Sequence, residues 1–281
     1  MILVFAAVAV WIGAWAFNGW LANGRFSGLA SVRLAVPLIF GATVIVVWEM
    51  IVRGLAVPAV ILPPPSTIVG AFFGNFGILW PDFVQTFAKG ALGGYVIGCG
   101  AALLTAILVD RYDFLRRGLL PVGIFMDVLP IVGTAPILVM WFGFDWQSKA
   151  AVVVVMVFFP MLVNTVAGLR DTSAMQRDLM RTYGASYWQT LFKLRFPAAL
   201  PFIFNGLKIA TTLALIGAIV AEFFGSPTRG LGFRISTSVG TLALDVVWAV
   251  IVVAALTGTA FYGAVAWLER RMTFWHPSQR K

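Results

Sequence analysis

Long apolar runs separated by short polar segments make up most of this sequence. Seven of these runs approach the length of about 20 residues that a helix needs to cross roughly 30 Å of hydrocarbon. Strands of a membrane barrel would be shorter and would alternate apolar with polar residues. The pattern therefore predicts seven helical spans, at about 2–21, 34–53, 84–109, 119–142, 149–169, 203–224 and 246–268.

Two further segments need a separate interpretation. The stretch 55–74 is rich in proline, which removes backbone hydrogen-bond donors, so it predicts an extended crossing at the surface followed by a short interfacial helix. The N-terminal stretch lacks the basic start and the small-residue cleavage site of a signal peptide. We expect it to be retained as a span.

The composition agrees with an integral membrane protein. Of the 281 residues 60% are apolar and 11% are charged, against roughly 25% charged residues in soluble domains, and the mean hydropathy is +0.94. The net charge of +9 would suggest nucleic acid in a soluble protein. In a membrane protein, Lys and Arg first report orientation, so no nucleic-acid partner is expected.

The basic residues predict which side each polar segment occupies. With the N-terminus outside, the segments 22–33, 110–118, 170–200 and 269–281 lie in the cytoplasm and carry most of the Lys and Arg residues. The opposite side then carries Arg53, Lys89, Lys149, Arg229 and Arg234. This bias is the one expected for cytoplasmic loops.

Catalytic and ligand-binding chemistry is sparse in the sequence. The one cysteine, Cys99, excludes an intrachain disulfide and a Cys-based metal cluster, and the one histidine, His276, lies in the polar C-terminal tail. The sequence has no G-x-x-x-x-G-K-[ST] phosphate loop, no Ser-His-Asp set and no H-E-x-x-H. We expect no enzyme activity and no cofactor, and ATP-derived energy would have to come from a partner.

Glycines and prolines mark two features of a helical bundle. Gly90, Gly94 and Gly98 recur at four-residue spacing, which lets another helix pack closely, and simple tight packing is the favoured interpretation. Prolines interrupt the fourth span, where each removes a donor and bends or breaks the helix, at Pro121, Pro130 and Pro136. Irregular backbone at membrane depth is tolerated inside protein or beside a water-filled cavity.

The polar segment 171–201 predicts a folded projection. Ser173 with Gln176, and Ser186 with Gln189, fit the S-x-x-Q capping box, so each pair opens a short helix. Gly184 is expected to end the first helix, and Pro197 the second. From these residues alone, a helix pair lying on the lipid headgroups is equally compatible.

The same segment resembles the cytoplasmic E-A-A loop of ABC importer permeases. Gly184 and the following "ASYWQTLFKLRFPAALP" match the second half of that pattern, whereas the E-A-A reads Asp178-Leu179-Met180. The resemblance covers about 34–275 and is closest to the nitrate, sulfonate and taurine group. Its other blocks follow in order: "ILPPPSTI", "LPIVGTAPILVMWFGFDWQSK", "FPMLVNTVAGLRD", "GLKIATTLALIGAIVAEFFG" and "RGLGFRI".

This resemblance implies an all-α type I importer transmembrane domain of about six core helices at 34–281, preceded by an extra helix and linker at 1–33. It also implies a second permease copy, in a homodimer, a pair of cytoplasmic ATP-binding subunits, and a periplasmic or lipid-anchored solute-binding protein. The coupling loop at 170–200 would dock on the ATPase. The residues expected at that contact are Ser173, Asp178, Leu179, Arg181, Tyr183, Gly184, Ala185 and Ser186.

Two acidic residues and two prolines are candidates for the translocation path. Asp127 falls within the broken span, where an ionisable group is a functional candidate, although it could instead cap an unwound segment. Glu222 lies near the outer end of its span and could touch solute, or form a structural hydrogen bond or gate latch. Pro130 and Pro136 would shape the path.

The solute class has only weak sequence signals. With Asp127, many aromatics and no evident intramembrane arginine, the sequence leans toward riboflavin or a thiamine-precursor pyrimidine over a nitrate-, sulfonate- or taurine-type anion. A secondary transporter would show inverted repeats and several buried acids or histidines. A structural membrane subunit would not need the broken helix, and a membrane enzyme would need a nucleophile or metal set.

Overall fold

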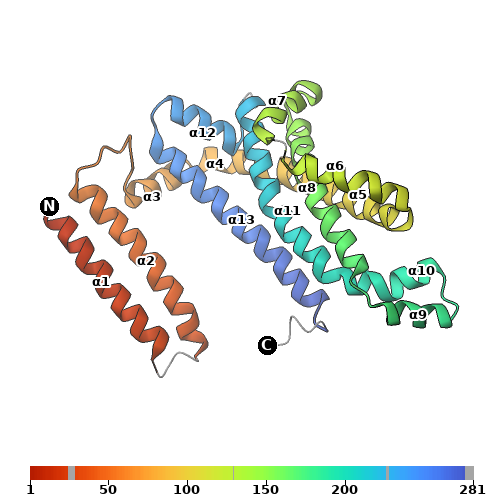
Figure 1. The fold of residues 1–281 in the computed structure, drawn as a ribbon. Coiled ribbons are helices and arrows are strands. Elements are labelled where there is room, and N and C mark those ends of the chain that lie inside the picture. Colours follow the sequence, from red (N-terminus) through yellow and green to blue (C-terminus); the bar gives the residue numbers. More distant parts are fainter. Residues whose placement is uncertain (25–28, 129, 226–227, 276–281) are drawn as a thin grey trace. The chain divides into compact units, whose positions relative to one another are not determined.

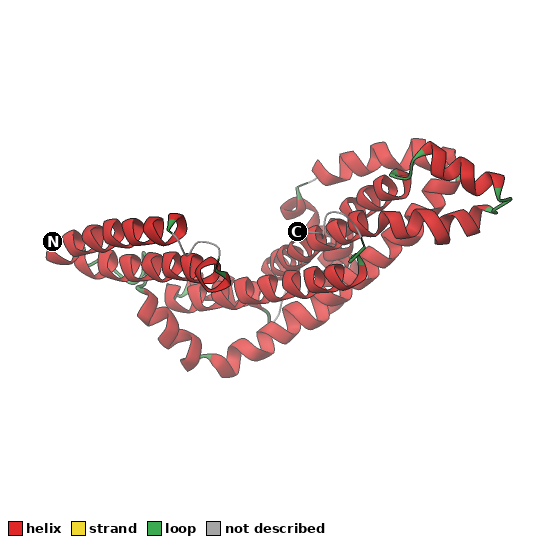
Figure 2. Ribbon diagram, turned by 90° about the horizontal axis from the view of Figure 1, so that it is seen from below, coloured by secondary structure: helices red, strands yellow, loops and turns green. Residues whose placement is uncertain are grey.

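The computed structural model of the chain describes residues 1–24, 29–128, 130–225 and 228–275. Within these ranges all regular structure is helical (Figure 2), as the apolar pattern predicts. The helices form two compact units, residues 1–77 with 237–251, and residues 78–236 with the chain from 252 onward.

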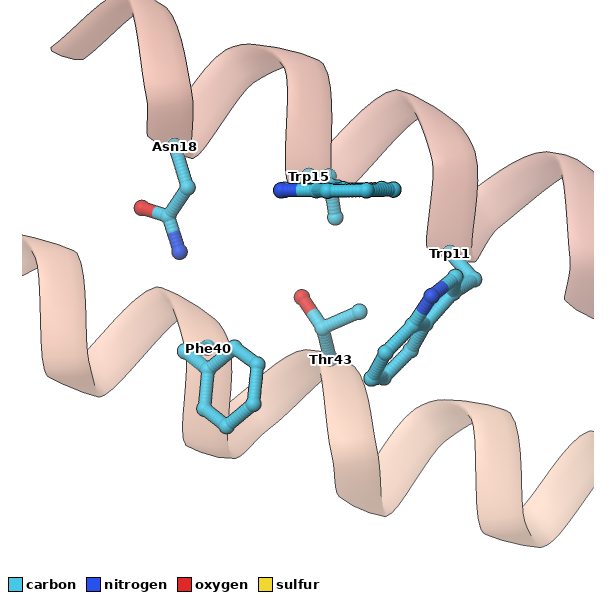
Figure 3. Close-up of a pocket in the computed structure, with 6 residues that line it drawn as sticks. Trp11, Trp15, Asn18, Phe40 and Thr43 are labelled. Atoms are coloured by element: carbon cyan, nitrogen blue, oxygen red, sulfur yellow. The ribbon is translucent and has the colours of Figure 1, made fainter. Parts of the chain in front are cut away.

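The first unit is built on a helical hairpin. It contains α1 (Ile2–Asn23), α2 (Ala30–Gly54) and the short α3 (Pro65–Gly74), which corresponds to the interfacial helix expected within 55–74. The Asn18 amide donates a hydrogen bond to the Val36 carbonyl at 3.2 Å, which joins α1 to α2. A hollow of about 280 Å³ lies between these helices, and Figure 3 shows five of the side chains that line it, those of Trp11, Trp15, Asn18, Phe40 and Thr43.

The remaining helices are labelled in Figure 1. They are α4 (Phe76–Phe83), a π-helical segment η1 (Val84–Ala91), α5 (Leu92–Arg111), α6 (Asp113–Val128), α7 (Ile131–Phe142), α8 (Trp146–Arg170), α9 (Ala174–Thr182), α10 (Tyr187–Thr190), a second π-helical segment η2 (Leu191–Arg195), α11 (Phe196–Gly225), α12 (Leu231–Gly240) and α13 (Leu244–Met272).

Six helical stretches in the described ranges are long and apolar enough to cross a membrane. They are Ile2–Asn23, Ser31–Gly54, Phe76–Arg111, Trp146–Arg170, Tyr187–Gly225 and Leu244–Met272. The prediction of an all-helical protein with membrane-spanning helices is confirmed.

The prediction of a single span at 119–142 is wrong, because this region is divided between α6 and α7. With 16 and 12 residues, these helices are only about 24 and 18 Å long. Pro130 is the N-cap of α7 and has extended backbone, with φ −69° and ψ 112°, so α7 starts as a separate helix after it. Pro136 lies inside α7 without ending it.

The prediction that Pro197 ends a helix is also wrong. The helical path runs from Tyr187 to Gly225, and Pro197 lies in the first turn of α11, directly after η2. A proline ring clashes with the carbonyl four residues earlier in a regular α-helix. The wider π-helical turn before Pro197 offers a physical reason why the helix continues past it.

The core of the second unit lies where α5, α8 and α11 pack together (Figure 1). A Cβ atom added at Gly94 would lie 2.5 Å from the Val153 Cβ, and one added at Gly98 would lie 2.5 Å from the Val157 Cγ2. At Gly90 the nearest atom would be the Lys149 Cβ, at 3.2 Å. Gly94 and Gly98 of α5, and Gly90 of η1, therefore lie in close contact with α8, as small residues do between membrane helices.

We predict that Gly94→Ala lowers the stability of the protein in detergent by about 1–3 kcal/mol, because the new methyl group overlaps Val153 and the Ala150 carbonyl. Gly93→Ala is the matched control, since its Cβ would meet only the Trp146 ring, at 4.0 Å, and alanine favours a helix. Thermal unfolding of the two variants measures the difference. Equal melting temperatures would contradict this account of the α5–α8 contact.

Candidate functional site

The segment between α8 and α11 forms a helical projection with two capped helices. The Ser173 hydroxyl accepts from the Gln176 amide N–H at 3.2 Å, and the Gln176 side chain accepts from the Ser173 N–H at 3.0 Å. Ser186 and Gln189 make the same pair of bonds, at 3.3 and 2.8 Å. Both predicted capping boxes are confirmed, so each short helix starts at a defined residue.

The turn between the two helices depends on Gly184. This residue has a φ of +66°, in the left-handed region that glycine enters without steric cost. Its N–H donates to the Arg181 carbonyl at 2.9 Å, and the Ala185 N–H donates to the Met180 carbonyl at 3.0 Å. This pair of bonds is a Schellman motif, which ends α9 and satisfies two of its terminal carbonyls.

An apolar stripe lies exposed on α9. Met175 and Leu179, and Tyr183 at the C-cap of α9, follow one another at four-residue spacing, which places them along one face of the helix. They are 82%, 54% and 77% exposed. Arg181 and Asp178 form an exposed ion pair at 3.6 Å, which contributes little to stability. The structure thus presents these side chains on the surface of the projection.

The base of the projection is held by a partly buried ion pair that the sequence pattern did not reveal. The Arg195 guanidinium donates to both Asp110 oxygens, at 2.7 and 2.6 Å, and its Nε donates to the Leu169 carbonyl at 2.9 Å. The Tyr187 hydroxyl donates to Asp110 at 2.9 Å. The side chains of Asp110 and Arg195 are 4% and 14% exposed. These four residues lie in or beside segments that the charge bias assigns to the cytoplasm, and we call them the cytoplasmic node.

A second buried polar cluster lies in segments that the charge bias assigns to the opposite side. Glu222 is 1% exposed and accepts from the Thr86 hydroxyl and from the Gly232 N–H, each at 2.8 Å. The Thr86 hydroxyl oxygen also accepts from the Leu231 N–H at 2.7 Å. Of the two roles considered for Glu222, this geometry favours a structural hydrogen-bond role over contact with solute.

Two further charged residues complete this outer cluster. Asp82 accepts from the Arg234 Nε at 2.7 Å and from the Gly230 N–H at 2.9 Å. The Lys149 ammonium is buried and donates to the Phe144 and Gly225 carbonyls. The cluster therefore joins η1, α8, α11 and the start of α12 through groups that burial requires to be paired.

The break between α6 and α7 lies beside a hollow of about 260 Å³. Its lining comes from four helices of the second unit: Met126, Ile131, Thr134, Val155, Met156, Pro160 and Leu213. These seven residues are uncharged, and one hydroxyl is their only side-chain hydrogen-bonding group. Pro130 caps the helix that borders the hollow, while the side chain of Asp127 is outside the part of the chain that the structure describes.

The sequence is similar to those of known transport proteins. Residues 94–274 match a family model described as binding-protein-dependent transport system inner membrane component. The riboflavin transport system permease RibX of Chloroflexus aurantiacus is 31% identical, over 83% of this chain and 87% of its own length. The formylaminopyrimidine transport permease ThiX of Halalkalibacterium halodurans is 29% identical, over 86% and 96%. A putative aliphatic sulfonates transport permease, SsuC of Bacillus subtilis, is 30% identical, over 86% and 87%.

We predict that Thr86→Val destabilises the protein by about 1–3 kcal/mol, because it leaves the Leu231 N–H without its acceptor and Glu222 without one donor. Valine has nearly the same shape, so no cavity forms. Thr259→Val is the control, since that exposed hydroxyl donates only to the Ala255 carbonyl of its own helix. If both variants unfold at the same temperature in detergent, Thr86 does not hold the outer cluster together.

Proposed function

Because this chain belongs to the family of binding-protein-dependent transport system inner membrane components, we propose that its α9–α10 projection docks on a cytoplasmic ATP-binding subunit. The protein is an ABC transporter permease of the inner membrane, a transport subunit with several membrane-spanning helices. The family implies ATP-binding and binding-protein partners. In our proposal two copies of the permease form the path, and a solute-binding protein delivers the solute from outside.

The length of the helical path into α11 supports this docking. Tyr187–Gly225 contains 39 residues, about 58 Å of helix, whereas the hydrocarbon core is about 30 Å thick. Near the end of α13, Glu269 pairs with Lys208 of α11 at 2.8 Å. Tyr187 precedes Lys208 by about 30 Å along the helical path. The projection can therefore extend beyond the ends of the spans to reach a soluble partner.

The exposed stripe on α9 gives the proposed contact its chemistry. Met175 and Leu179 are apolar and Tyr183 has an aromatic ring with one hydroxyl, and removing exposed apolar groups from water into a contact lowers the free energy. An apolar groove on the ATP-binding subunit would fit them. The flanking Asp178 and Arg181 would lie at the rim of that contact. Met175 lies outside the set expected from the family pattern, and its exposure adds it to the proposal.

The uncharged hollow beside the α6–α7 break is the observation that supports a neutral solute. Its methionine and leucine side chains suit an apolar or aromatic ring, and Thr134 offers one hydroxyl. We propose that Pro130 and Pro136 shape this part of the path and that Asp127 borders it. The relatives named for riboflavin and formylaminopyrimidine favour a solute of that kind, whereas the sulfonate relative keeps an organic anion as the alternative.

We also propose that the permease domain proper comprises 34–281 and that α1, within 1–33, is an addition to it. The match to the family model, residues 94–274, lies wholly within 34–281. In the structure α1 packs against α2 and belongs to the same compact unit, so the proposed boundary is one of family membership and not of packing.

The docking proposal predicts that Leu179→Asp reduces co-purification of the ATP-binding subunit from solubilised membranes by at least about tenfold. The added carboxylate would have to be buried, without a partner, in the apolar contact. Leu242→Asp is the matched control, because Leu242 is also exposed but lies in a turn assigned to the outside. Unchanged recovery of the ATPase with the first variant would exclude the α9 stripe from the contact.

The solute proposal predicts that cells lacking the protein lose uptake of radiolabelled riboflavin or of a formylaminopyrimidine, while taurine uptake is unchanged. A neutral hollow offers no cation to compensate the charge of a sulfonate. Uptake would be measured for all three compounds in deletion and complemented strains. Selective loss of taurine uptake would move the assignment to the anion alternative.

A further inference from the structure

The cytoplasmic node connects the projection to three helices of the second unit. Asp110 lies in the last turn of α5, Leu169 lies in the last turn of α8, and Arg195 ends η2 directly before α11. The last carbonyls of a helix have no partner within it. The Arg195 Nε supplies one to Leu169, and a cation at a helix C-terminus is also favoured by the helix dipole.

The π-helical segment η2 explains how two donors from one helix reach the same carboxylate. Each residue of an α-helix turns the chain by about 100°, so residues eight apart, such as Tyr187 and Arg195, would point about 80° away from each other. A π-helical turn holds one extra residue. With that extra residue, the angle around the helix axis between Tyr187 and Arg195 is the angle that seven residues give in a regular α-helix. The two side chains then point within about 20° of each other. Both donate to the same oxygen of Asp110.

The contacts also fix the direction of each group. A bidentate Arg–carboxylate pair holds both side chains in one plane, and burial of the pair strengthens its hydrogen bonds. The guanidinium carbon of Arg111, next to Asp110, lies 5.0 Å from the centre of the Tyr187 ring. A movement of the projection therefore has to move the ends of α5 and α8 with it.

We infer that the cytoplasmic node, and not the exposed loop alone, transmits movement of the ATP-binding subunits into the membrane-spanning helices, with Asp110 and Arg195 as its positioning residues. This inference rests on the proposed docking of the projection. Rigid-body movement of packed helices requires stiff connections between them. The node supplies such a connection where three helices meet.

The test compares Asp110→Asn, Arg195→Gln and the double variant in the complete transporter reconstituted in liposomes. We expect the ATP-binding subunit to stay bound and ATP to be hydrolysed. The number of riboflavin molecules taken up per ATP should fall about fivefold or more, within the usual range of coupling between sites. If the uptake measurements in deletion strains identify taurine as the solute, taurine is used in place of riboflavin. Arg195→Lys should show a smaller loss, since lysine keeps the charge but not the planar fork.

Arg117→Gln is the control, because Arg117 is exposed on α6, and it should leave the ratio unchanged. The double variant controls for misfolding of the single variants. Each single variant leaves one charge without its partner, whereas the double variant removes both charges. A double variant with the ratio of the wild type would overturn the inference, and so would loss of ATPase binding in all three node variants. If the unaltered chain recruits no ATPase, the proposed function itself fails before the node variants are compared.

Discussion

The requirement that every buried charge be paired shapes the second unit of this protein. Hydrocarbon offers no hydrogen-bond partners, so an unpaired ionic group there is costly. Within the described residues, the chain meets this requirement with two compact clusters and with the Lys208–Glu269 pair. Asp110 and Arg195 pair in the segments assigned to the cytoplasm, while Asp82, Lys149, Glu222 and Arg234 lie in the outer cluster. Between the clusters, α5, α8 and α11 pack through small and apolar side chains.

This division suits a transport subunit that must move as a unit. Close contact at Gly94 and Gly98 and a shared apolar core join α5 to α8, so in the proposed mechanism packed helices, and not flexible loops, carry a displacement. The hollow lies between α6, α7, α8 and α11, and beside it Pro130 has extended backbone at the start of α7, which membrane depth tolerates inside protein or beside a water-filled cavity. The stiff bundle and the interrupted segment thus have complementary roles in the proposed mechanism.

Local features of this fold could be predicted from the sequence, because their causes are local. The capping boxes at Ser173 and Ser186 and the turn at Gly184 depend on residues within a few positions of each other, and the structure contains all three. Helix register is harder to predict. A π-helical segment shifts the register by one residue. Because η2 could not be predicted from the sequence, neither the continuation of the helix past Pro197 nor the alignment of Arg195 with Tyr187 could be predicted.

The charged pairs could not be predicted from one sequence because their members are far apart along the chain. Asp110 and Arg195 are 85 residues apart, and Asp82 and Arg234 are 152 residues apart. Counting basic residues placed Arg195 in the cytoplasm but gave no partner for it. The available signal was weak: an acidic residue at the end of an apolar run, as at Asp110, needs some partner near the membrane surface.

The central claim is that the projection contacts an ATP-binding subunit, and site-directed photo-crosslinking tests it most directly. Cys99→Ala removes the only native cysteine, so that Leu179→Cys can carry a single photoreactive label in native membranes. The account predicts an adduct with a protein that contains an ATP-binding phosphate loop, identified by mass spectrometry. A label at position 179 that reacts only with lipid or water, in a chain correctly inserted in the membrane, would contradict the account.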